Sequence, residues 1–310
     1  MRAIRYDAYG GLEQVKLGEL PEPRLGTGPL VRVKCAALNP KDSLFRKGKF
    51  ALLSGRKFPK QCGLDFAGVV EREGGGLSVG TPVFGALNEW TFRRGTLAEL
   101  VAPDAHEVAA IPPGVDAADA ASIALVGLTA LQALRDVARI APGADVLING
   151  ASGGVGTVAI QLARVLGAKV STVSSDEMRA FCTSLGSQEA LAYSTLPEVL
   201  ASRRFDTVFD VFGNLRFGKA RGALKKNGVF VSTVPSLGRV VSDRLSRWSS
   251  HQERLVIVTP RRDDLDQLGA WLREGKLRAV IDSRFPLSDF AAAFGKLESK
   301  HTHGKIVIEL

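Results

Sequence analysis

The sequence contains few of the side chains that disulfide or metal cross-links require. Its 310 residues include three cysteines, Cys35, Cys62 and Cys182, and four histidines. The cysteines are odd in number and far apart, which argues against disulfides and against a Cys-x-x-Cys zinc site. The histidines share no metal-ligand spacing with Cys35 or Cys62. We therefore expect a protein without disulfides and without a bound metal.

Long apolar segments are also missing. No apolar run reaches about 18 residues, the length that a membrane span needs. Residues 1–6 lack the apolar segment of a signal peptide. We therefore expect no membrane partner and a cytoplasmic location. Repeats and low-complexity segments are absent, and 45% apolar with 24% charged residues is typical of a globular protein.

The net charge is positive, and the basic residues are scattered along the sequence. Lys and Arg number 41 against 32 Asp and Glu, a formal net charge of +9. The basic residues gather only in short clusters, such as those at 93–94, 203–204, 225–226 and 261–262. A surface that binds nucleic acid would concentrate them in one patch or stripe. We expect a solvated surface that partly serves an anionic cofactor, with RNA or DNA as an unlikely partner.

Residues 146–170 combine a strand, a glycine turn, a helix and a second strand. The apolar run 146–148 is typical of a buried parallel strand. The turn Ala151-x-Gly153-x-x-Gly156 follows at once, with alanine at the first glycine position. Such a turn lets a pyrophosphate approach the amides at a helix N-terminus, where a Cβ at Gly153 would hold it off. The stretch predicts a Rossmann dinucleotide-binding domain; a glycine-rich turn of another α/β fold is the alternative.

The rest of the chain suggests a second domain on either side of this one. We expect a β-rich domain at 1–121, a Rossmann domain at 122–258, and a return of the C-terminal segment 259–310 to the first domain. Strands are expected at 30–35, 66–71, 205–210, 228–232, 255–258, near 280 and at 305–308. Helices are expected at 265–272, at 287–297 and over 116–139, the last broken near Gly127.

Several separated motifs follow one another in an order that resembles a known superfamily. They are 39–42 with Arg46 and Gly48, 63–70, 127–130, 150–156, 209–213 and 301–307. The set resembles the medium-chain dehydrogenase/reductases, and within them the zinc-free quinone oxidoreductase branch that includes zeta-crystallin and the reticulon-4-interacting protein. The resemblance covers nearly the whole chain. It implies an α/β protein with a GroES-like domain beside the Rossmann domain.

The same resemblance bears on zinc. Zinc-dependent members carry a cysteine ligand where this chain has Asn39, and Gly-His-Glu where it has Gly63-Leu64-Asp65. Leu64 has no lone pair, and an amide oxygen is a poor zinc ligand beside thiolate and imidazole. Alcohol oxidation in the superfamily relies on zinc. The resemblance therefore implies hydride delivery to an already electrophilic carbon of a quinone or an α,β-unsaturated carbonyl.

The end of the second Rossmann strand indicates which nicotinamide cofactor is used. NAD-binding folds usually place Asp or Glu there, to accept a hydrogen bond from the ribose 2′-OH. Here Ser174 and Ser175 stand instead, and Arg179 follows one helical turn later. Hydroxyls and a guanidinium suit a 2′-phosphate, so we predict NADPH. Asp176 opposes this if it turns inward, and the serines could instead be turn and N-cap residues.

The resemblance implies further cofactor contacts along the chain. Two of these contacts have an alternative: Thr129 could pack at a domain junction rather than bind the cofactor, and His303 could be a solvated loop histidine. The implied contacts are Thr129, Ser152, Gly153, Gly154, Val155, Gly156, Tyr193, Asn214, Pro235 and His303.

Asn39 and Asp42 are the catalytic residues that the resemblance implies. Asn39 would reach the nicotinamide ribose or the substrate carbonyl, and Asp42 would orient Arg46 or an Asn39-linked hydrogen bond, or merely cap a helix. Members of the branch often carry tyrosines at the positions of Leu44 and Phe50, so the obvious general acid is missing. Protonation would come from water or a ribose hydroxyl. The expected apolar pocket is lined by Leu44, Phe50, Leu64, Phe84 and Val126.

These observations favour an NADPH-dependent reductase of quinones or conjugated enones and enals. One alternative is a catalytically idle NADPH-binding sensor, structural protein or RNA binder, favoured by the missing tyrosines and the basic charge. Another is an enoyl-thioester reductase, which would need a tyrosine acid and a basic channel. We also expect a homodimer joined along the apolar edge at 255–258, unless residues 239–252 cover that edge.

Overall fold

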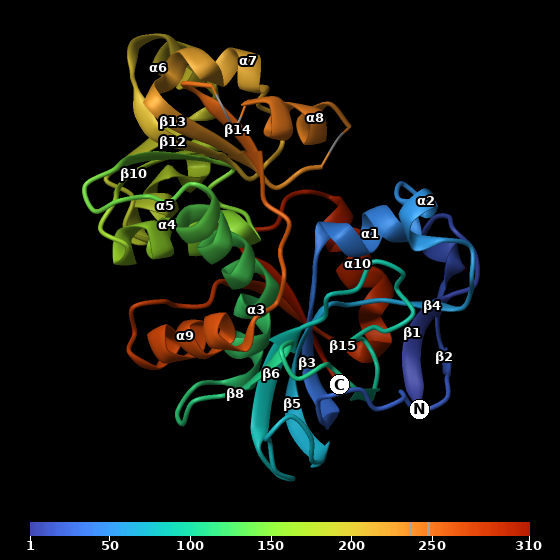
Figure 1. Cartoon of the computed structure of the whole chain (residues 1–310). Helices are drawn as coiled ribbons and strands as arrows, with labels where there is room; N and C mark the ends of the chain where they lie inside the picture. The colour runs from blue at the N-terminus through green and yellow to red at the C-terminus, as the bar shows by residue number, and fades with distance from the viewer. Residues whose placement is uncertain (236, 247–248) are drawn as a thin grey trace. The chain divides into compact units, whose positions relative to one another are not determined.

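The computed structural model describes residues 1–235, 237–246 and 249–310 (Figure 1). It divides the chain into two compact units. We call Thr129–Val258 the Rossmann unit, and Met1–Leu128 with Thr259–Leu310 the β-rich unit. The first division falls inside helix α3 (Ala117–Leu131) rather than at 121/122, and the second falls at 258/259.

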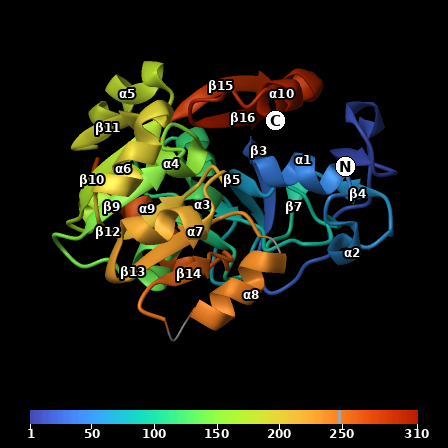
Figure 2. The same cartoon turned by 90° about the horizontal axis from the view of Figure 1, so that it is seen from above.

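The Rossmann unit contains a six-stranded sheet in which every pairing is parallel. Its strands are β9 (Asp145–Asn149), β10 (Lys169–Ser174), β11 (Glu189–Ala192), β12 (Phe205–Asp210), β13 (Leu224–Ser232) and β14 (Gln252–Leu255). They lie in the order β11-β10-β9-β12-β13-β14, which Figure 2 shows from above. This is the doubly wound order 3-2-1-4-5-6, so the predicted fold class is confirmed. The order reverses between β9 and β12, where such sheets bind their ligands.

The last strand of this sheet lies earlier than the sequence predicts. β14 spans Gln252–Leu255 instead of 255–258, and Ile257 is 62% exposed. The strand was missed because it contains Glu253, a charged residue that is nevertheless buried. Its backbone exchanges two hydrogen bonds with the Ser246 hydroxyl, and its carboxylate lies 3.7 Å from the Arg239 guanidinium. These partners, which offset the cost of burial, come from tertiary structure.

The β-rich unit contains two sheets. A three-stranded antiparallel sheet has the order β2-β1-β4, and a larger sheet has the order β15-β16-β3-β5-β6-β8 with β7 paired to β3. The bounds are β1 (Arg2–Tyr6), β2 (Val15–Glu19), β3 (Leu30–Leu38), β4 (Lys60–Gln61), β5 (Asp65–Arg72), β6 (Pro82–Ala86), β7 (Leu100–Val101), β8 (Val108–Ala110), β15 (Ile281–Pro286) and β16 (Lys305–Glu309). Strand β16 of the C-terminal segment pairs antiparallel with β3, with Val307 opposite Ala37.

Helix α3 runs through Gly127 without a break, so the predicted interruption is wrong. A Cβ at Gly127 would lie 2.8 Å from the Leu268 side chain of α9 (Arg262–Arg273), so the glycine permits close packing of the two helices, which lie side by side in Figure 1. Together with a π-helical continuation, α3 forms a helix at Ala117–Val137 that is long and apolar enough to cross a membrane by composition alone. Of its apolar window, 83% is buried inside the protein, as in a core helix.

Candidate functional site

The glycine turn follows β9 and leads into helix α4 (Gly154–Val165). A Cβ at Gly156 would lie 2.4 Å from the Gly150 carbonyl oxygen, so this glycine lets the helix start against the turn. A Cβ at Gly153 would have one neighbour, the Gly150 carbonyl oxygen at 3.8 Å, so a side chain would fit there without a clash. The first N–H groups of an α-helix have no intrahelical acceptor. Such amides fit the pyrophosphate of a dinucleotide.

The two serines at the end of β10 differ in exposure: Ser174, its last residue, is buried, and Ser175, which follows it, is exposed. Ser174 is fully buried, and its hydroxyl donates to the Ser175 carbonyl at 3.1 Å. The expectation that both hydroxyls face a phosphate is therefore wrong for Ser174, whose side chain lies inside the sheet. Ser175 is exposed. Arg179, on α5 (Arg179–Ser184), donates to the Ala190 carbonyl at 2.8 Å and pairs with Asp176 at 3.1 Å.

Two further predicted contacts lie near the carboxyl ends of the strands. Tyr193 follows β11 and lies against Phe212, with ring centroids 6.0 Å apart. Burial raises the pKa of Tyr193, so its phenol stays protonated at neutral pH. Asn149, the last residue of β9, donates to the Asn214 Oδ1 atom at 2.7 Å. This contact orients the Asn214 amide so that its nitrogen is turned away from Asn149.

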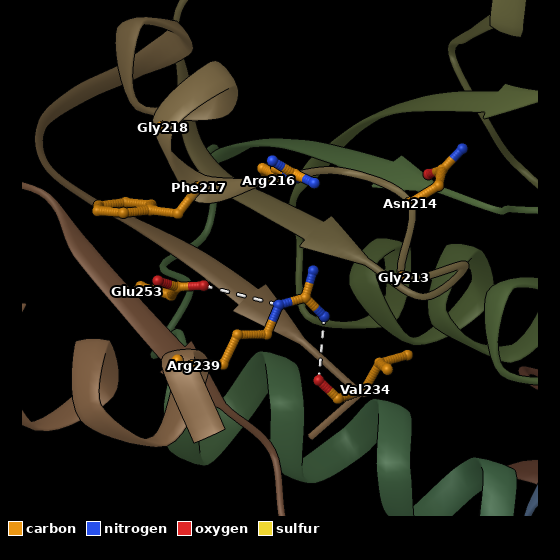
Figure 3. Close-up of a pocket in the computed structure, with 9 residues that line it drawn as sticks. Gly213, Asn214, Arg216, Phe217, Gly218, Val234, Arg239 and Glu253 are labelled. Carbon is orange, nitrogen blue, oxygen red and sulfur yellow. Dashed lines mark hydrogen bonds and ion pairs between the residues drawn. The ribbon is translucent and has the colours of Figure 1, made fainter. Parts of the chain in front are cut away.

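A cavity of about 650 Å³ lies at the carboxyl ends of β12 and β13 (Figure 3). Arg239, on α8 (Leu237–Leu245), holds its walls together: it donates to the Leu215 carbonyl at 2.8 Å and the Val234 carbonyl at 3.0 Å, and pairs with Glu253. One guanidinium thus links the loops that follow the two strands. The lining residues are Gly213, Asn214, Arg216, Phe217, Gly218, Val234, Gly238, Arg239 and Glu253.

The remaining predicted cofactor contacts are dispersed. Thr129 is buried at the start of the Rossmann unit, and Pro235 is exposed after β13. His303 belongs to the other unit, where its side chain is exposed and its backbone N–H donates to Asp282 at 2.8 Å. Their roles stay predictions. Ser152, Gly154 and Val155 are part of the glycine turn and the first turn of α4, and are partly exposed.

In the β-rich unit, Asn39 belongs to a buried polar network. Its Nδ2 donates to Asp65 Oδ2 at 2.7 Å and to the Ala37 carbonyl at 3.3 Å. Its Oδ1 accepts a hydrogen bond from Lys305 Nζ at 2.6 Å, and Lys305 also lies 3.0 Å from Asp65. The second Asp65 oxygen accepts from the Leu125 N–H of α3 at 2.5 Å. Both Asn39 donor hydrogens are thus already used, so it is poorly suited to donate to a substrate carbonyl.

Asp42 caps the helix that Asn39 precedes. It lies in α1 (Pro40–Arg46), and its carboxylate accepts the Asn39 N–H and the Gly63 N–H, each at 2.8 Å. Of the roles expected for Asp42, the Asn39-linked and capping ones are confirmed, and orientation of Arg46 is wrong. Arg46 instead donates to the Gly10 carbonyl at 2.6 Å and pairs with Glu298. Burial raises the pKa of Asp42 to about 6, against the opposing effect of the two N–H donors.

The raised pKa of Asp42 predicts how stability depends on pH. The folded-state value of about 6 lies above the ordinary 3.8, so the folded protein binds this proton more tightly than the unfolded chain. The Asp42 contribution to the free energy of unfolding should therefore fall as the pH rises from about 4 to about 6. Urea denaturation of wild type and Asp42→Asn over this range would show their difference shrinking. A difference between wild type and Asp42→Asn that stays constant over this range would contradict the prediction.

The five residues expected to line a substrate pocket have unequal exposure. Leu64 and Phe84 are fully buried, and Leu64 is part of the core of the β-rich unit. Val126 is 3% exposed. Leu44 is 40% exposed, and Phe50 stacks on Phe45 with ring centroids 4.9 Å apart. Leu64 and Phe84 present no surface to a ligand here, whereas Leu44 and Phe50 remain candidates.

Asn39 and Leu64 stand where zinc-dependent members of the superfamily carry metal ligands, and their surroundings do not fit zinc. The Asn39 amide is hydrogen-bonded on both sides, and Leu64 offers no donor atom. The Lys305 ammonium, 2.6 Å from Asn39 Oδ1, would repel a second cation. Over residues 1–235, 237–246 and 249–310, no group of three or more His, Cys, Asp or Glu side chains could hold a metal ion.

Sequence reasoning missed the partners that orient these side chains. Asp65 and Lys305 occur in the motifs 63–70 and 301–307, and a lysine opening the apolar strand 305–308 was the available signal. Arg239 had no such signal, because its acceptors include backbone carbonyls, one of them at Leu215, 24 residues away along the chain.

Comparisons with known proteins agree with this arrangement. The family model for the alcohol dehydrogenase GroES-like domain matches residues 27–113, and that for zinc-binding dehydrogenase matches residues 185–308. The chloroplast envelope quinone oxidoreductase homolog of Arabidopsis thaliana is 31% identical over 100% of this chain and 98% of its own length. The chloroplastic NADPH-dependent alkenal/one oxidoreductase of the same plant is 32% identical, over 99% of this chain and 79% of its length.

A solved structure shows the same fold over the full length. The quinone oxidoreductase from Coxiella burnetii is 31% identical and superposes with a TM-score of 0.90, covering 100% of this chain and 99% of its own. The predicted GroES-like domain is thereby confirmed alongside the Rossmann domain. The chain belongs to the medium-chain dehydrogenase/reductase family, in its quinone oxidoreductase branch.

Proposed function

We propose that this chain is an NADPH-dependent reductase that transfers hydride to quinones or α,β-unsaturated carbonyls without a metal. The observation that carries the proposal is the glycine turn at Gly153, where a Cβ would have a single neighbour, at 3.8 Å, and which lies at the N-terminus of α4 and next to the switch point of the sheet. Exposed Ser175 with Arg179, and no carboxylate as the last residue of β10, favour NADPH over NADH. Two Arabidopsis relatives named for quinone and NADPH-dependent alkenal/one reduction support the same class.

The side chains around Asn39 favour reduction over alcohol oxidation. When bound, the nicotinamide supplies the hydride. Oxidising an alcohol would also need a base or metal for its proton. Asp42 and Asp65 are buried and accept hydrogen bonds from within the β-rich unit, so neither is placed as a free base. Reduction of a conjugated carbonyl needs neither, since the charge is delocalised onto oxygen and water can protonate the product.

A turnover assay tests this function. NADPH oxidation should require an acceptor with a conjugated carbonyl, and simple alcohols with NADP⁺ should give no reaction. The panel contains quinones, enals, enones and enoyl-thioesters, so that exclusive turnover of the thioesters would identify the enoyl-thioester reductase alternative. Binding of NADPH, seen by nicotinamide fluorescence, without reduction of any acceptor would favour the idle binding protein instead.

We further propose a homodimer joined along residues 255–258, at the end of β14, and a location in the cytoplasm. Among the described strands, β14 ends the Rossmann sheet and has a neighbour on one side only. Ile257, two residues after β14, is 62% exposed, and an exposed apolar side chain at the end of an edge strand favours contact with a second copy. The alternative, a cover formed by residues 239–252, is favoured by the Ser246 hydroxyl, which binds the Glu253 backbone N–H and carbonyl. Light scattering should give twice the 33.0 kDa mass of the chain. A monomer at every practical concentration would contradict the dimer.

A further inference from the structure

Lys305 is buried in the β-rich unit with all three of its N–H groups in use. It is 5% exposed, and it donates to the Leu38 carbonyl at 2.8 Å, to Asn39 Oδ1 at 2.6 Å and to Asp65 Oδ2 at 3.0 Å. An ammonium has three donors and no acceptor. Lys305 therefore has no hydrogen left for a ligand, and any influence on one must pass through its partners.

The Lys305–Asp65 pair determines which way the Asn39 amide faces. In the observed orientation, Oδ1 lies on the ammonium and Nδ2 lies 2.7 Å from the carboxylate. A flipped amide would direct N–H groups at the ammonium and its oxygen at the carboxylate, and both contacts would be repulsive. The buried ion pair thus selects one of the two amide orientations, in a setting where solvent screening is weak.

We propose that Lys305 is a positioning residue that fixes Asn39 as a hydrogen-bond acceptor for an O–H or N–H group of the ligand. Asp65 and the Ala37 carbonyl occupy both Nδ2 hydrogens, whereas Oδ1 keeps one lone pair beside its bond to Lys305. Asn39 would therefore bind a ligand hydroxyl or amide N–H and not the substrate carbonyl. The inference rests on the proposed function, because that function supplies the ligand.

The competing explanation is that Lys305 has only a structural role. Asp65 also accepts the Leu125 N–H, so Lys305 could serve only to neutralise a carboxylate that anchors α3. The two explanations differ in what happens to the Asn39 amide when the ammonium is removed. A structural role leaves that amide as it was, provided that the protein stays folded.

Lys60 provides a matched control in the same unit. It is fully buried, and it donates to the Ser54 carbonyl at 2.7 Å and the Thr91 carbonyl at 2.6 Å. It has no contact with Asn39 among the described residues. Lys60→Met and Lys305→Met therefore both remove a buried ammonium, and only the second removes a partner of Asn39.

The direct test is hydrogen exchange of the Asn39 side-chain amide. The chain has five asparagines, so selective ¹⁵N-asparagine labelling gives five side-chain signals, and Asn39→Ala assigns one of them. In wild type and in Lys60→Met, the Asn39 amide should exchange with D₂O much more slowly than that of exposed Asn88. In Lys305→Met it should exchange about tenfold faster or more. If Lys305→Met does not fold, Lys305→Gln is measured instead, because it removes the ammonium charge and leaves Asp65, the acceptor of Asn39 Nδ2, in place.

Cofactor binding and turnover give the second readout. Lys305→Met, or Lys305→Gln in its place, should raise the Kd for NADPH or lower kcat/KM for a quinone by about tenfold or more. Lys60→Met should lower the melting temperature and change neither constant. The proposal is overturned if Asn39 exchanges like Asn88 in wild type, or if removing Lys305 leaves its exchange and both constants unchanged. A wild type that reduces no acceptor would refute the proposed function alone, because the amide exchange is measured without one.

Discussion

Gly153→Val should abolish useful NADPH binding and leave the fold intact. The Cβ at this position clashes with nothing, since its nearest atom lies at 3.8 Å, and the backbone angles of Gly153, φ −80° and ψ 175°, are accessible to any residue. The valine side chain would occupy the space that a pyrophosphate needs beside the first amides of α4. Two lost charge-assisted hydrogen bonds would cost roughly 3–6 kcal/mol, so Kd should rise at least about 100-fold.

Gly156→Ala is the informative contrast to this substitution. Its Cβ would lie 2.4 Å from the Gly150 carbonyl oxygen and 2.6 Å from that of Ala151, both backbone atoms that cannot easily move. Gly156→Ala should therefore lower the melting temperature, whereas Gly153→Val should leave it within a few degrees of wild type. Fluorescence titration with NADPH and a thermal melt of each variant measure the two effects. Wild-type affinity in Gly153→Val would show that the cofactor does not bind at this turn.

NADPH should bind much more tightly than NADH. Two substitutions near the end of β10 should reduce this difference in affinity between the two cofactors. Arg179→Ala removes the cation one helical turn after Ser175, and Ser175→Asp adds a carboxylate that would repel a 2′-phosphate. Losing one charge-assisted contact costs roughly 1.5–3 kcal/mol, or about 10- to 150-fold in affinity. The Kd values for NADPH and NADH, measured for wild type and both variants, give the preference for NADPH as a ratio. Arg179→Ala should leave the Kd for NADH nearly unchanged.

Asp176 provides the control for this prediction. It pairs with Arg179 at 3.1 Å, but the two side chains are 78% and 51% exposed, and such surface pairs contribute little. A 2′-phosphate can therefore replace Asp176 as the partner of Arg179. Asp176→Asn should tighten NADPH binding by releasing the guanidinium. Equal affinity of the wild type for NADPH and NADH would refute the cofactor assignment.

The elements that were predicted well depend on local sequence signals. Strand β12 was predicted at 205–210 and lies at Phe205–Asp210, because its apolar residues Phe205, Val208 and Phe209 are all buried in one sheet. The wrong predictions for two elements, the position of β14 and a break in α3, share a cause. Glu253 in β14 and Gly127 in α3 are residues that disfavour their elements, and each is accommodated by a contact from a distant segment, with Arg239 and with Leu268 respectively.

The sequence by itself determined the Rossmann half of the protein and its glycine turn. The turn, its strand and its helix are contiguous, so their spacing alone specifies where a dinucleotide can approach the backbone. Only the tertiary structure decided how Asn39 is used. Its partners Asp65 and Lys305 lie 26 and 266 residues away along the chain. No local pattern reports such a contact, because it forms only when β16 pairs with β3 and brings the Lys305 ammonium to the Asn39 amide.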